Sequence, residues 1–346
     1  MEKKPIINNT ILVKLTNKEL VRTLFRKRQT ATRAEIASET GLSVATCGTI
    51  LNEMLASNEI YVDKMEDSNG GRPARRFRYN KDFIQVACIA ISYDLYVKTM
   101  HYIVANAFGE IIEEQKDEYE IIDFDTVSGV VEPIMNKYPN IKSLTISIPG
   151  ESYDGKVRFC DIKELQDAPL EKEFKRIYNI NVMVDGIAQV AAYGYYNSTP
   201  ELSGKTVAVL MAPRDLHLGA GIIVNGQLTK GDTHLAGEVS FIATNNISRE
   251  EVLARMPDRE FLIDSMVTAL TAIISVINPS RIAIYGSAVK EDMYAPLYER
   301  CHEIVPTVFM PELKIISDFD EYFKNGLIKL AIESTTTGLK LVNKNL

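Results

Sequence analysis

The chain of 346 residues is long enough for two or three packed units, and its 46% hydrophobic and 25% charged residues are ordinary for a globular protein. No uninterrupted apolar run reaches the roughly 18 to 20 residues that a membrane-spanning helix needs. The first residues also lack the apolar stretch of a secretory signal peptide. We therefore expect a cytoplasmic protein with no membrane partner.

The charge of the chain is unevenly distributed. Residues 1–80 carry 14 Lys and Arg against 9 Asp and Glu, whereas the remainder carries 25 against 37, within a net charge of −7. A basic segment attracts polyanions and an acidic body repels them. Any contact with nucleic acid is therefore expected within the first eighty residues.

This basic segment has the pattern of successive short helices. Residues 18–27 place apolar side chains on one helical face, with Asn17 available as a cap, and a polar break follows at 28–30. Thr32 and Glu35 then have the spacing of a capping box, which predicts the start of a second helix.

A third helix is expected from about Val44 to Ala56, because Gly41 can end the second helix and Ser43 can cap the next. One side of this helix is apolar, and the other carries small or polar side chains that could enter a DNA major groove. The proposed base-reading residues are Ser43, Ala45, Thr46, Thr49 and Asn52. A plain solvated helix face is the alternative interpretation.

An arginine-rich hairpin follows these helices. Residues 60–62 predict a strand, 67–71 a turn and 72–79 a returning strand, an arrangement typical of the wing of a winged helix-turn-helix. Guanidinium groups on a wing can bind phosphates or enter a narrow minor groove. The further residues expected to contact DNA are Arg33, Arg72, Arg75 and Arg76.

Several short motifs resemble the amino-terminal module of the ROK family of repressors and sugar kinases. They are the segment 32–37, the Thr40-Gly41-Leu42-Ser43 turn, Gly71-Arg72-Pro73 and Asn80. The resemblance implies a winged helix-turn-helix DNA-binding domain over residues 1–80.

Beyond Asn80 the apolar runs predict an α/β body. Strands are expected at 86–91, 97–104, 143–148, 182–184, 207–211, 221–224 and 282–285, with a turn at 109–112 and helices such as 126–137 and 261–277. Two strand groups, separated near residue 200, suggest two lobes with a ligand cleft between them.

The body also resembles ROK proteins, through landmarks that occur in the family's order. They lie at 146–150, 191–194, 218–226, 236–239 and 278–286. The resemblance implies a two-lobed, actin-like (ribonuclease-H-like) ATPase-type fold. The first lobe is expected over 81–200, with a carboxy-terminal helix at 322–346 packed back onto it, and the second lobe, with the cleft and the dimer interface, over 201–321.

The parts that a sugar kinase needs are altered in this chain. A kinase uses a carboxylate to take the proton of the attacking hydroxyl, but the position that the resemblance gives to this base is Ile187. Asp185 is a weaker candidate for a displaced base. Bulky side chains replace the first phosphate loop at 92–96, and Pro213 lacks the amide hydrogen that the second loop needs. We therefore expect no catalytic residue, no ATP cofactor and no enzymatic activity.

The zinc site of the family is also missing. The resemblance places its histidine at Phe241 and its three cysteines after it, yet 242–256 contain no cysteine. No metal is therefore expected, and packing by Phe241, Ile242, Val252 and Leu253 would replace the brace that the metal gives the ligand loop in relatives. The four scattered cysteines are expected to be buried thiols, and the four histidines to be structural or superficial.

Part of a sugar pocket remains. The resemblance assigns sugar contacts to Glu238 and to the Pro149-Gly150 loop, although the family's asparagine and aspartate have become Gly186 and Ile187. The candidate ligand residues are Pro149, Gly150, Asp185, Gly186, Gln189, Gly221 and Glu238. In the alternative interpretation, Glu238 is a structural acid in a cleft that binds nothing.

Together these features predict a transcriptional repressor, a homodimer or dimer of dimers, that binds a palindromic operator in double-stranded DNA. Its effector would be a sugar or a sugar phosphate. An active carbohydrate kinase with an added DNA-binding domain is the first alternative, and a scaffold for protein interactions is the second.

Overall fold

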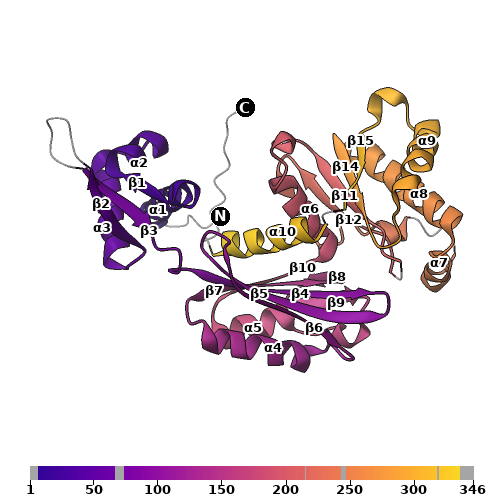
Figure 1. Cartoon of the computed structure of the whole chain (residues 1–346), viewed down its shortest axis with the longest axis horizontal. Helices are drawn as coiled ribbons and strands as arrows, with labels where there is room; N and C mark the ends of the chain where they lie inside the picture. Colours follow the sequence, from indigo (N-terminus) through magenta and orange to yellow (C-terminus); the bar gives the residue numbers. More distant parts are fainter. Residues whose placement is uncertain (1–6, 67–73, 215, 243–246, 318, 336–346) are drawn as a thin grey trace.

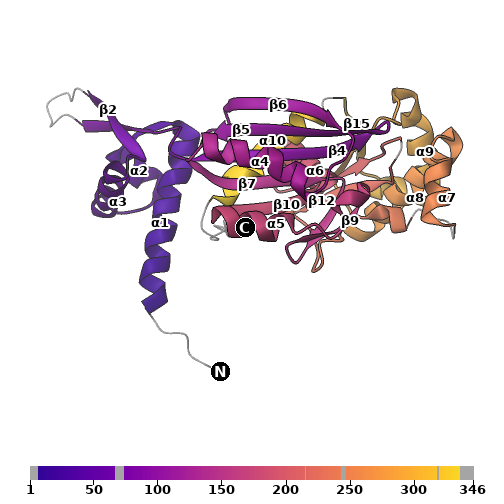
Figure 2. The same ribbon diagram turned by 90° about the horizontal axis from the view of Figure 1, so that it is seen from below.

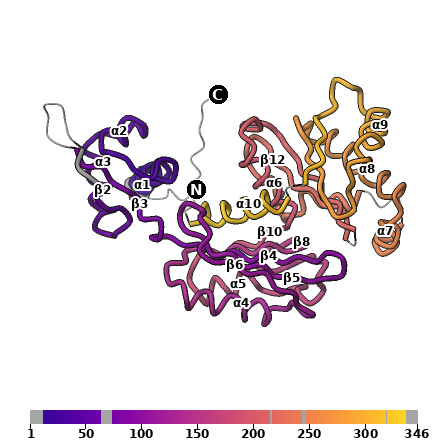
Figure 3. The backbone as a smooth tube through the Cα atoms, in the orientation of Figure 1, coloured from indigo at the N-terminus to yellow at the C-terminus, as the bar shows by residue number. Residues whose placement is uncertain are grey.

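The computed structural model describes residues 7–66, 74–214, 216–242, 247–317 and 319–335. Figure 1 shows three parts: an amino-terminal unit, a first lobe built on one five-stranded sheet, and a second lobe built on another. Figure 3 traces the last helix back between the two lobes.

The amino-terminal unit contains three helices and a small antiparallel sheet of order β1-β3-β2. Its elements are α1 (Ile7–Arg28), β1 (Thr30–Thr32), α2 (Arg33–Thr40), α3 (Val44–Ala56), β2 (Ile60–Glu66) and β3 (Ala74–Tyr79). The predicted turn at 67–71 and Arg72 lie outside the described residues.

Local sequence signals fix the ends of α2 and α3. Thr32 and Glu35 form the predicted capping box, Gly41 ends α2 in the left-handed conformation with φ of 71°, and the hydroxyl of Ser43 caps α3. The predicted bounds of α3 are confirmed.

Two expectations for the beginning of the chain are wrong. The first helix begins at Ile7 rather than Lys18, so Asn17 lies inside it and does not cap it; Figure 2 shows the start of α1 projecting from the unit. The expected polar break includes Thr30, which instead starts β1 and pairs with Arg78 of β3. Pairing with a distant strand leaves little signal in a three-residue segment.

The sheet of the first lobe has the order β10-β7-β4-β5-β6. Strands β4, β5 and β6 are antiparallel, and β7 and β10 are parallel to β4. The strands are β4 (Gln85–Asp94), β5 (Val97–Asn106), β6 (Ile111–Tyr119), β7 (Ile141–Ile148) and β10 (Asn181–Gly186). The interpretation of 109–112 as a turn alone missed β6, an edge strand whose charged side chains hide the usual apolar alternation.

Helices cover both faces of this sheet. Helices α4 (Phe124–Lys137) and α5 (Leu170–Tyr178) pack on one face, where Phe124 stacks on Phe174, and α10 (Phe319–Ser334) lies on the other face against β4 and β7. A small hairpin, β8 (Gly150–Tyr153) and β9 (Lys156–Cys160), extends from the end of β7. The predicted return of a carboxy-terminal helix to the first lobe is thus seen for 319–334, and the rest of the predicted helix lies outside the described residues.

The second lobe has a sheet of order β13-β12-β11-β14-β15. Its strands are β11 (Val207–Met211), β12 (Gly219–Val224), β13 (Gln227–Leu228), β14 (Arg281–Tyr285) and β15 (Glu312–Ile315). Its helices are α7 (Arg249–Arg255), α8 (Arg259–Ile277) and α9 (Tyr294–Ile304), and α6 (Ile187–Asn197) contacts β11 and β12. Single 3-10 turns occur at Lys163–Leu165, Pro200–Leu202, Val239–Phe241, Glu291–Met293 and Thr307–Phe309.

By length and composition α8 could span a membrane, contrary to the expectation from the sequence. However, 56% of its most apolar window is buried inside the protein. Its buried side chains belong to the core of the second lobe.

The two lobes meet where α6 packs closely on α10. A Cβ atom on Gly194 would lie 1.7 Å from the carbonyl oxygen of Tyr322, and one on Gly326 would lie 2.3 Å from that of Val190. Because neither glycine has a side chain, the two helix backbones touch. Helix α6 thereby links the sheet of the second lobe to α10, which rests on the sheet of the first.

The amino-terminal unit shares a buried core with the body. The ring of Tyr79 lies 6.0 Å from that of Phe25 and 5.9 Å from that of Phe108, which follows β5. Beside it, the fully buried carboxylate of Glu59 accepts hydrogen bonds from the guanidinium of Arg22 and pairs with Lys18. The unit is therefore held against the body by aromatic packing beside a compensated buried charge.

Replacing Gly194 with alanine is expected to lower the free energy of unfolding by about 3 kcal/mol, because the added methyl must separate two helix backbones. Urea denaturation followed by far-ultraviolet circular dichroism measures the loss. Gly129, inside α4, is the matched control, because a Cβ atom added there would have no described atom within 4 Å. At Gly129 alanine should raise stability by up to about 1 kcal/mol, and equal effects at the two positions would contradict the close packing.

Candidate nucleic-acid interface and ligand cleft

Helix α3 presents an open face of small side chains. Ser43, Ala45, Thr49 and Asn52 are exposed, as the sequence predicts, and Thr46 is half-buried. Its apolar residues Ile50, Leu51 and Met54 are buried in the unit. The exposed face is unobstructed by any described part of the chain.

Some of these polar groups are already used within the helix. The Ser43 hydroxyl accepts a hydrogen bond from the Thr46 amide at 3.1 Å and lies 2.8 Å from the Thr46 hydroxyl. Val44, which the sequence pattern did not single out, is 56% exposed in the first turn of α3. An exposed methyl-bearing side chain there could contact a thymine methyl group.

Arg33, at the start of α2, lies over α3. A Cβ atom on Gly48 would be 3.5 Å from the guanidinium carbon of Arg33. The small size of Gly48 therefore leaves room for the arginine beside the open face of α3.

The arginines of β3 differ in their surroundings. Arg75 is exposed, and it forms no ion pair with any residue that the structure describes. Arg76 donates to Glu35 at 2.8 Å and Arg78 to Asp63 at 3.0 Å. Among the described arginines of β3, Arg75 is thus open to an anion, whereas Arg76 supports the carboxylate of the capping box.

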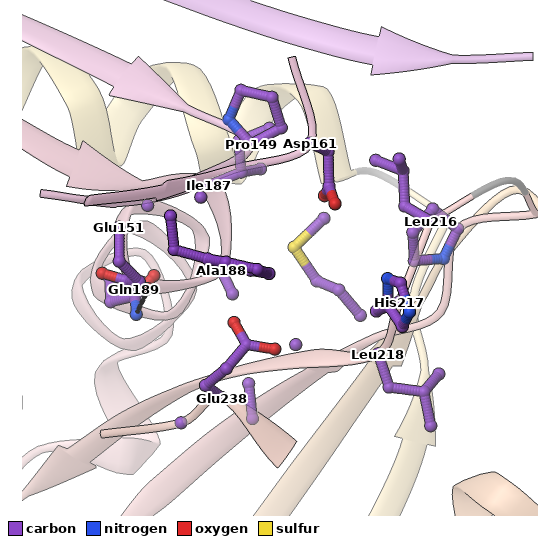
Figure 4. Close-up of a pocket in the computed structure, with 18 residues that line it drawn as sticks. Pro149, Glu151, Asp161, Ile187, Ala188, Gln189, Leu216, His217, Leu218 and Glu238 are labelled. Carbon is purple, nitrogen blue, oxygen red and sulfur yellow. Dashed lines mark hydrogen bonds between the residues drawn. The ribbon is translucent and has the colours of Figure 1, made fainter. Parts of the chain in front are cut away.

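A cavity lies between the two lobes and is lined by residues of both (Figure 4). The candidate ligand residues that line it are Pro149, Gly150, Gly186, Gln189 and Glu238. Asp185 and Gly221 do not line it. A Cβ atom on Gly221 would instead lie 2.0 Å from the Ala188 carbonyl oxygen, so this glycine lets β12 approach α6.

The first turn of α6 forms one wall of the cavity. Ile187, at the position that the resemblance gives to the catalytic base, lines it together with Ala188 and Gln189. The Gln189 side chain donates to the Glu151 carboxyl at 2.5 Å. The hydrocarbon side chain of Ile187 cannot exchange a proton at this position.

Acidic side chains dominate the polar lining. Glu151 and Asp161 join Glu238 around the cavity, and Figure 4 shows Asp161 and Glu238 pointing into it from opposite sides. Burial raises the pKa of Glu151 to about 8 and that of Asp161 to about 6, and it also raises the pKa of Glu238. Glu151 and Asp161 were not predicted from the sequence because isolated acids in a hairpin carry no motif, although Glu151 directly follows Pro149-Gly150.

Asp185 has a different role from the one that the sequence suggests. Its buried carboxylate forms an ion pair with Lys230 of the second lobe, and its second oxygen has no hydrogen-bond partner among the described residues. Nearby, His234 bonds to the backbone carbonyl of Ser152 at 2.8 Å. Residues of the 230–241 segment therefore hold the second lobe onto the first.

The side of the cleft expected to hold nucleotide phosphates is built from bulky groups. At the tip of the β4–β5 hairpin, Leu95 and Tyr96 have φ of 50° and 65°, and Tyr96 is 79% exposed. Met211, Pro213 and Leu216 line the adjoining part of the cavity. These side chains occupy positions where phosphate-binding loops use glycine and free amides.

The described polar residues outside the cleft are the remaining candidates for metal ligands. Among the described residues no group of histidine, cysteine, aspartate or glutamate could hold a metal ion. The four cysteines are buried thiols, as expected. Each histidine has a structural partner: Glu114, the Arg249 carbonyl, the Ser152 carbonyl and Thr307 for His101, His217, His234 and His302.

Sequence comparison finds xylose repressors. The chain is 26% identical over 252 residues to the xylose repressor of Caldicellulosiruptor bescii, covering 69% of this chain and 61% of the repressor. It is 22% identical over 242 residues to the xylose repressor of Bacillus subtilis, covering 67% and 62%. The matches thus span less than two thirds of these repressors' own lengths. No family model matches the chain.

Structural comparison extends the similarity to nearly the whole chain. A ROK-family transcriptional regulator, a homologue of the E. coli MLC protein, superposes with a TM-score of 0.69 at 17% identity, covering 94% of this chain and 98% of that one. A ROK hexokinase from Thermus thermophilus gives 0.55 at 13% identity, covering 73% and 98%. The fold of the body is therefore the α/β fold of ROK proteins, as the sequence predicts.

Replacing Glu151 with glutamine tests whether the buried Glu151 carboxyl keeps its proton in the folded protein. Since burial raises the pKa of Glu151 to about 8, the folded protein holds a proton that the unfolded chain, with an ordinary glutamate pKa near 4.3, has released. The contribution of Glu151 to the stability of the wild type should therefore fall as pH rises from about 4.5 to 8, and the variant should lack this loss.

At pH 8.5 the Glu151→Gln variant is expected to exceed the wild type in free energy of unfolding by on the order of 2 kcal/mol, and at pH 5 by far less. Urea denaturation at both pH values measures the difference. A difference that does not grow with pH would mean that the Glu151 carboxyl is not held in its protonated form.

Proposed function

We propose that this chain, whose resemblance to the ROK family the comparisons support, is a DNA-binding transcriptional repressor of carbohydrate-related genes that responds to a sugar. The observation that carries the proposal is the juxtaposition of an open, small-residue face on α3 with a sugar-kinase fold that has isoleucine at the position of the base. The xylose repressors provide independent support. Such a regulator would act in the cytoplasm.

The amino-terminal unit has the parts of a winged helix-turn-helix. Gly41 makes the turn between α2 and α3, and β2 and β3 form the hairpin of the wing. In this class of domain, residues early in the second of these helices reach base edges. Ala45, Thr49 and Asn52 then read bases, with Arg33 beside them, and Arg75 contacts the DNA backbone or the minor groove.

A dimer would place two such units on a palindromic operator. Two-fold symmetry matches each unit to one half-site, which lengthens the recognised sequence and raises its specificity. The body would carry the dimer contacts.

In this proposal the body binds a sugar without phosphorylating it. Ile187 cannot accept a proton, bulky side chains at Leu95 and Tyr96 replace the glycines that let a backbone approach phosphate, and Pro213 has no amide hydrogen to donate. The alternative, an active carbohydrate kinase, is tested by an ADP-release assay with a panel of hexoses and pentoses. We expect no release above the rate without sugar, and sugar-dependent release would establish the kinase.

The effector is best matched by an uncharged sugar. Hydroxyl groups can donate to the oxygens of Glu151, Asp161 and Glu238, whereas a phosphate would meet a largely acidic lining. Xylose is the first sugar to test, because the relatives are named as xylose repressors.

Replacing Arg75 with alanine should weaken binding to the protein's own promoter fragment and to unrelated DNA alike. Loss of one phosphate contact in each amino-terminal unit should reduce the magnitude of the slope of log affinity against log salt concentration by about 1. Fluorescence anisotropy with labelled DNA at several salt concentrations measures this slope. Arg259→Ala, at an exposed ion pair of the second lobe, is the control; an unchanged slope for Arg75→Ala would remove the wing from the interface.

Replacing Glu238 with alanine should abolish the heat of sugar binding in calorimetric titration, because the variant loses acceptor oxygens inside the cavity. The panel comprises xylose, glucose and their terminal phosphates. The wild type should bind at least one free sugar and none of the phosphates. If no member of the panel gives heat with the wild type, the cleft is not a sugar sensor.

A further inference from the structure

The guanidinium of Arg249 contacts two neighbouring aromatic rings from different lobes. Its central carbon is 4.8 Å from the ring centre of Phe159 and 4.7 Å from that of Phe241. The two rings are themselves 6.2 Å apart at 48°. Phe159 belongs to β9 of the first lobe, and Phe241 ends the Val239–Phe241 turn of the second. The arginine and the two neighbouring rings thus form a cation–π cluster that joins the lobes.

The same arginine is connected to the ligand cleft. Its Nη1 donates to the Ser240 hydroxyl at 2.6 Å, and that hydroxyl donates in turn to the Glu238 carboxylate. The backbone carbonyl of Arg249 is bonded at 3.1 Å to the ring of His217, which also lines the cavity. Arg249 thus fixes the orientation of Glu238 through one intermediate hydroxyl.

The metal that the family resemblance implies does not fit this region. Phe241 stands where the resemblance places the histidine ligand, and the described residues offer no cluster of metal-binding side chains. Of the residues expected to replace the metal by packing, Val252 is buried, whereas Phe241 and Ile242 are about half exposed, at 50% and 51%. The Phe241 ring instead covers Arg249.

We propose that Arg249, through its contacts with both Phe159 and Phe241, forms a clamp between the lobes. It is a positioning residue for the ligand cleft and replaces the metal brace of the metal-bearing relatives. It holds the 237–241 segment against the first lobe and aims Glu238 into the cavity through Ser240. The identity of the ligand as a sugar rests on the proposed function. The clamp itself does not depend on that proposal.

Arginine suits this role better than lysine. Its flat guanidinium can stack on one ring and contact the other while its edge donates hydrogen bonds, whereas an ammonium group has no flat face. Arg249→Lys keeps the charge and loses the stacking, and Arg249→Gln loses both. Arg255→Lys is the matched control. Arg255 belongs to the same helix as Arg249, and its guanidinium carbon lies 4.2 Å from the ring centre of Phe261, but Arg255 has no contact with the cleft.

A first experiment needs no ligand. Carbon-13 NMR of labelled glutamate follows the titration of Glu238, which faces Glu151, Asp161 and Arg249, in the full-length protein. Since the Arg249 charge and the Ser240 hydrogen bond lower the pKa of Glu238 against the effect of burial, Arg249→Gln should raise this pKa, with Arg249→Lys between it and the wild type. An unchanged titration in Arg249→Gln would overturn the clamp.

A second experiment measures sugar affinity by calorimetry with the sugar that the wild type binds. Arg249→Lys should weaken binding about tenfold and Arg249→Gln further, while Arg255→Lys leaves it unchanged. Phe241→Leu removes one half-exposed ring without touching the charge and should also weaken binding several-fold. Incubation with a chelator should change nothing in the wild type, and loss of binding on chelation would contradict the replacement of the metal.

These readouts separate the clamp from the proposed function. If the wild type binds no sugar but Arg249→Gln shifts the Glu238 titration, the clamp stands and the sugar effector fails. If the sugar binds equally to the wild type, Arg249→Gln and Phe241→Leu, the sugar effector stands and the clamp is overturned.

Discussion

The close contact between α6 and α10 sets the arrangement of the body. Because Gly194 and Gly326 let the helix backbones touch, and Gly221 lets β12 rest on the Ala188 carbonyl, the two sheets are held at fixed positions on either side of this helix pair. The first turn of α6 then faces the gap between the lobes, where Ile187 and Gln189 line the cavity. A contact made of backbone alone thus determines where the ligand site lies.

The chemistry of the cleft follows from what surrounds this turn. Its acids come from different segments: Glu151 from the β8–β9 hairpin, Asp161 from the residues that follow it, and Glu238 from the second lobe. The cations nearest to them are already engaged, Lys230 with Asp185 and Arg249 with two rings and Ser240. Such a site accepts hydrogen bonds from a neutral polyol and offers little to a phosphate. This lining is the basis for proposing a sensor in place of a phosphoryl-transfer centre.

The sequence alone predicted those features, such as helix caps and helix ends, that depend on residues close together in the chain. The capping box at Thr32, the left-handed Gly41 and the bounds of α3 are all set by interactions within a few residues. The pairing of β1 with β3 and the edge strand β6 depend on distant partners, so periodicity did not reveal them. In the site, Glu238 and Gln189 were anticipated from the resemblance, whereas Glu151 and Asp161 reach it through the fold alone.

DNA binding and ligand binding are, on this view, two properties of one coupled molecule. The most direct test is to titrate the sugar, by calorimetry, into the free protein and into the protein saturated with its own promoter fragment. Because coupling between two sites is reciprocal, a sugar that releases DNA must bind the DNA-bound form more weakly, by about fivefold or more. Equal affinity for the two forms would contradict this coupling.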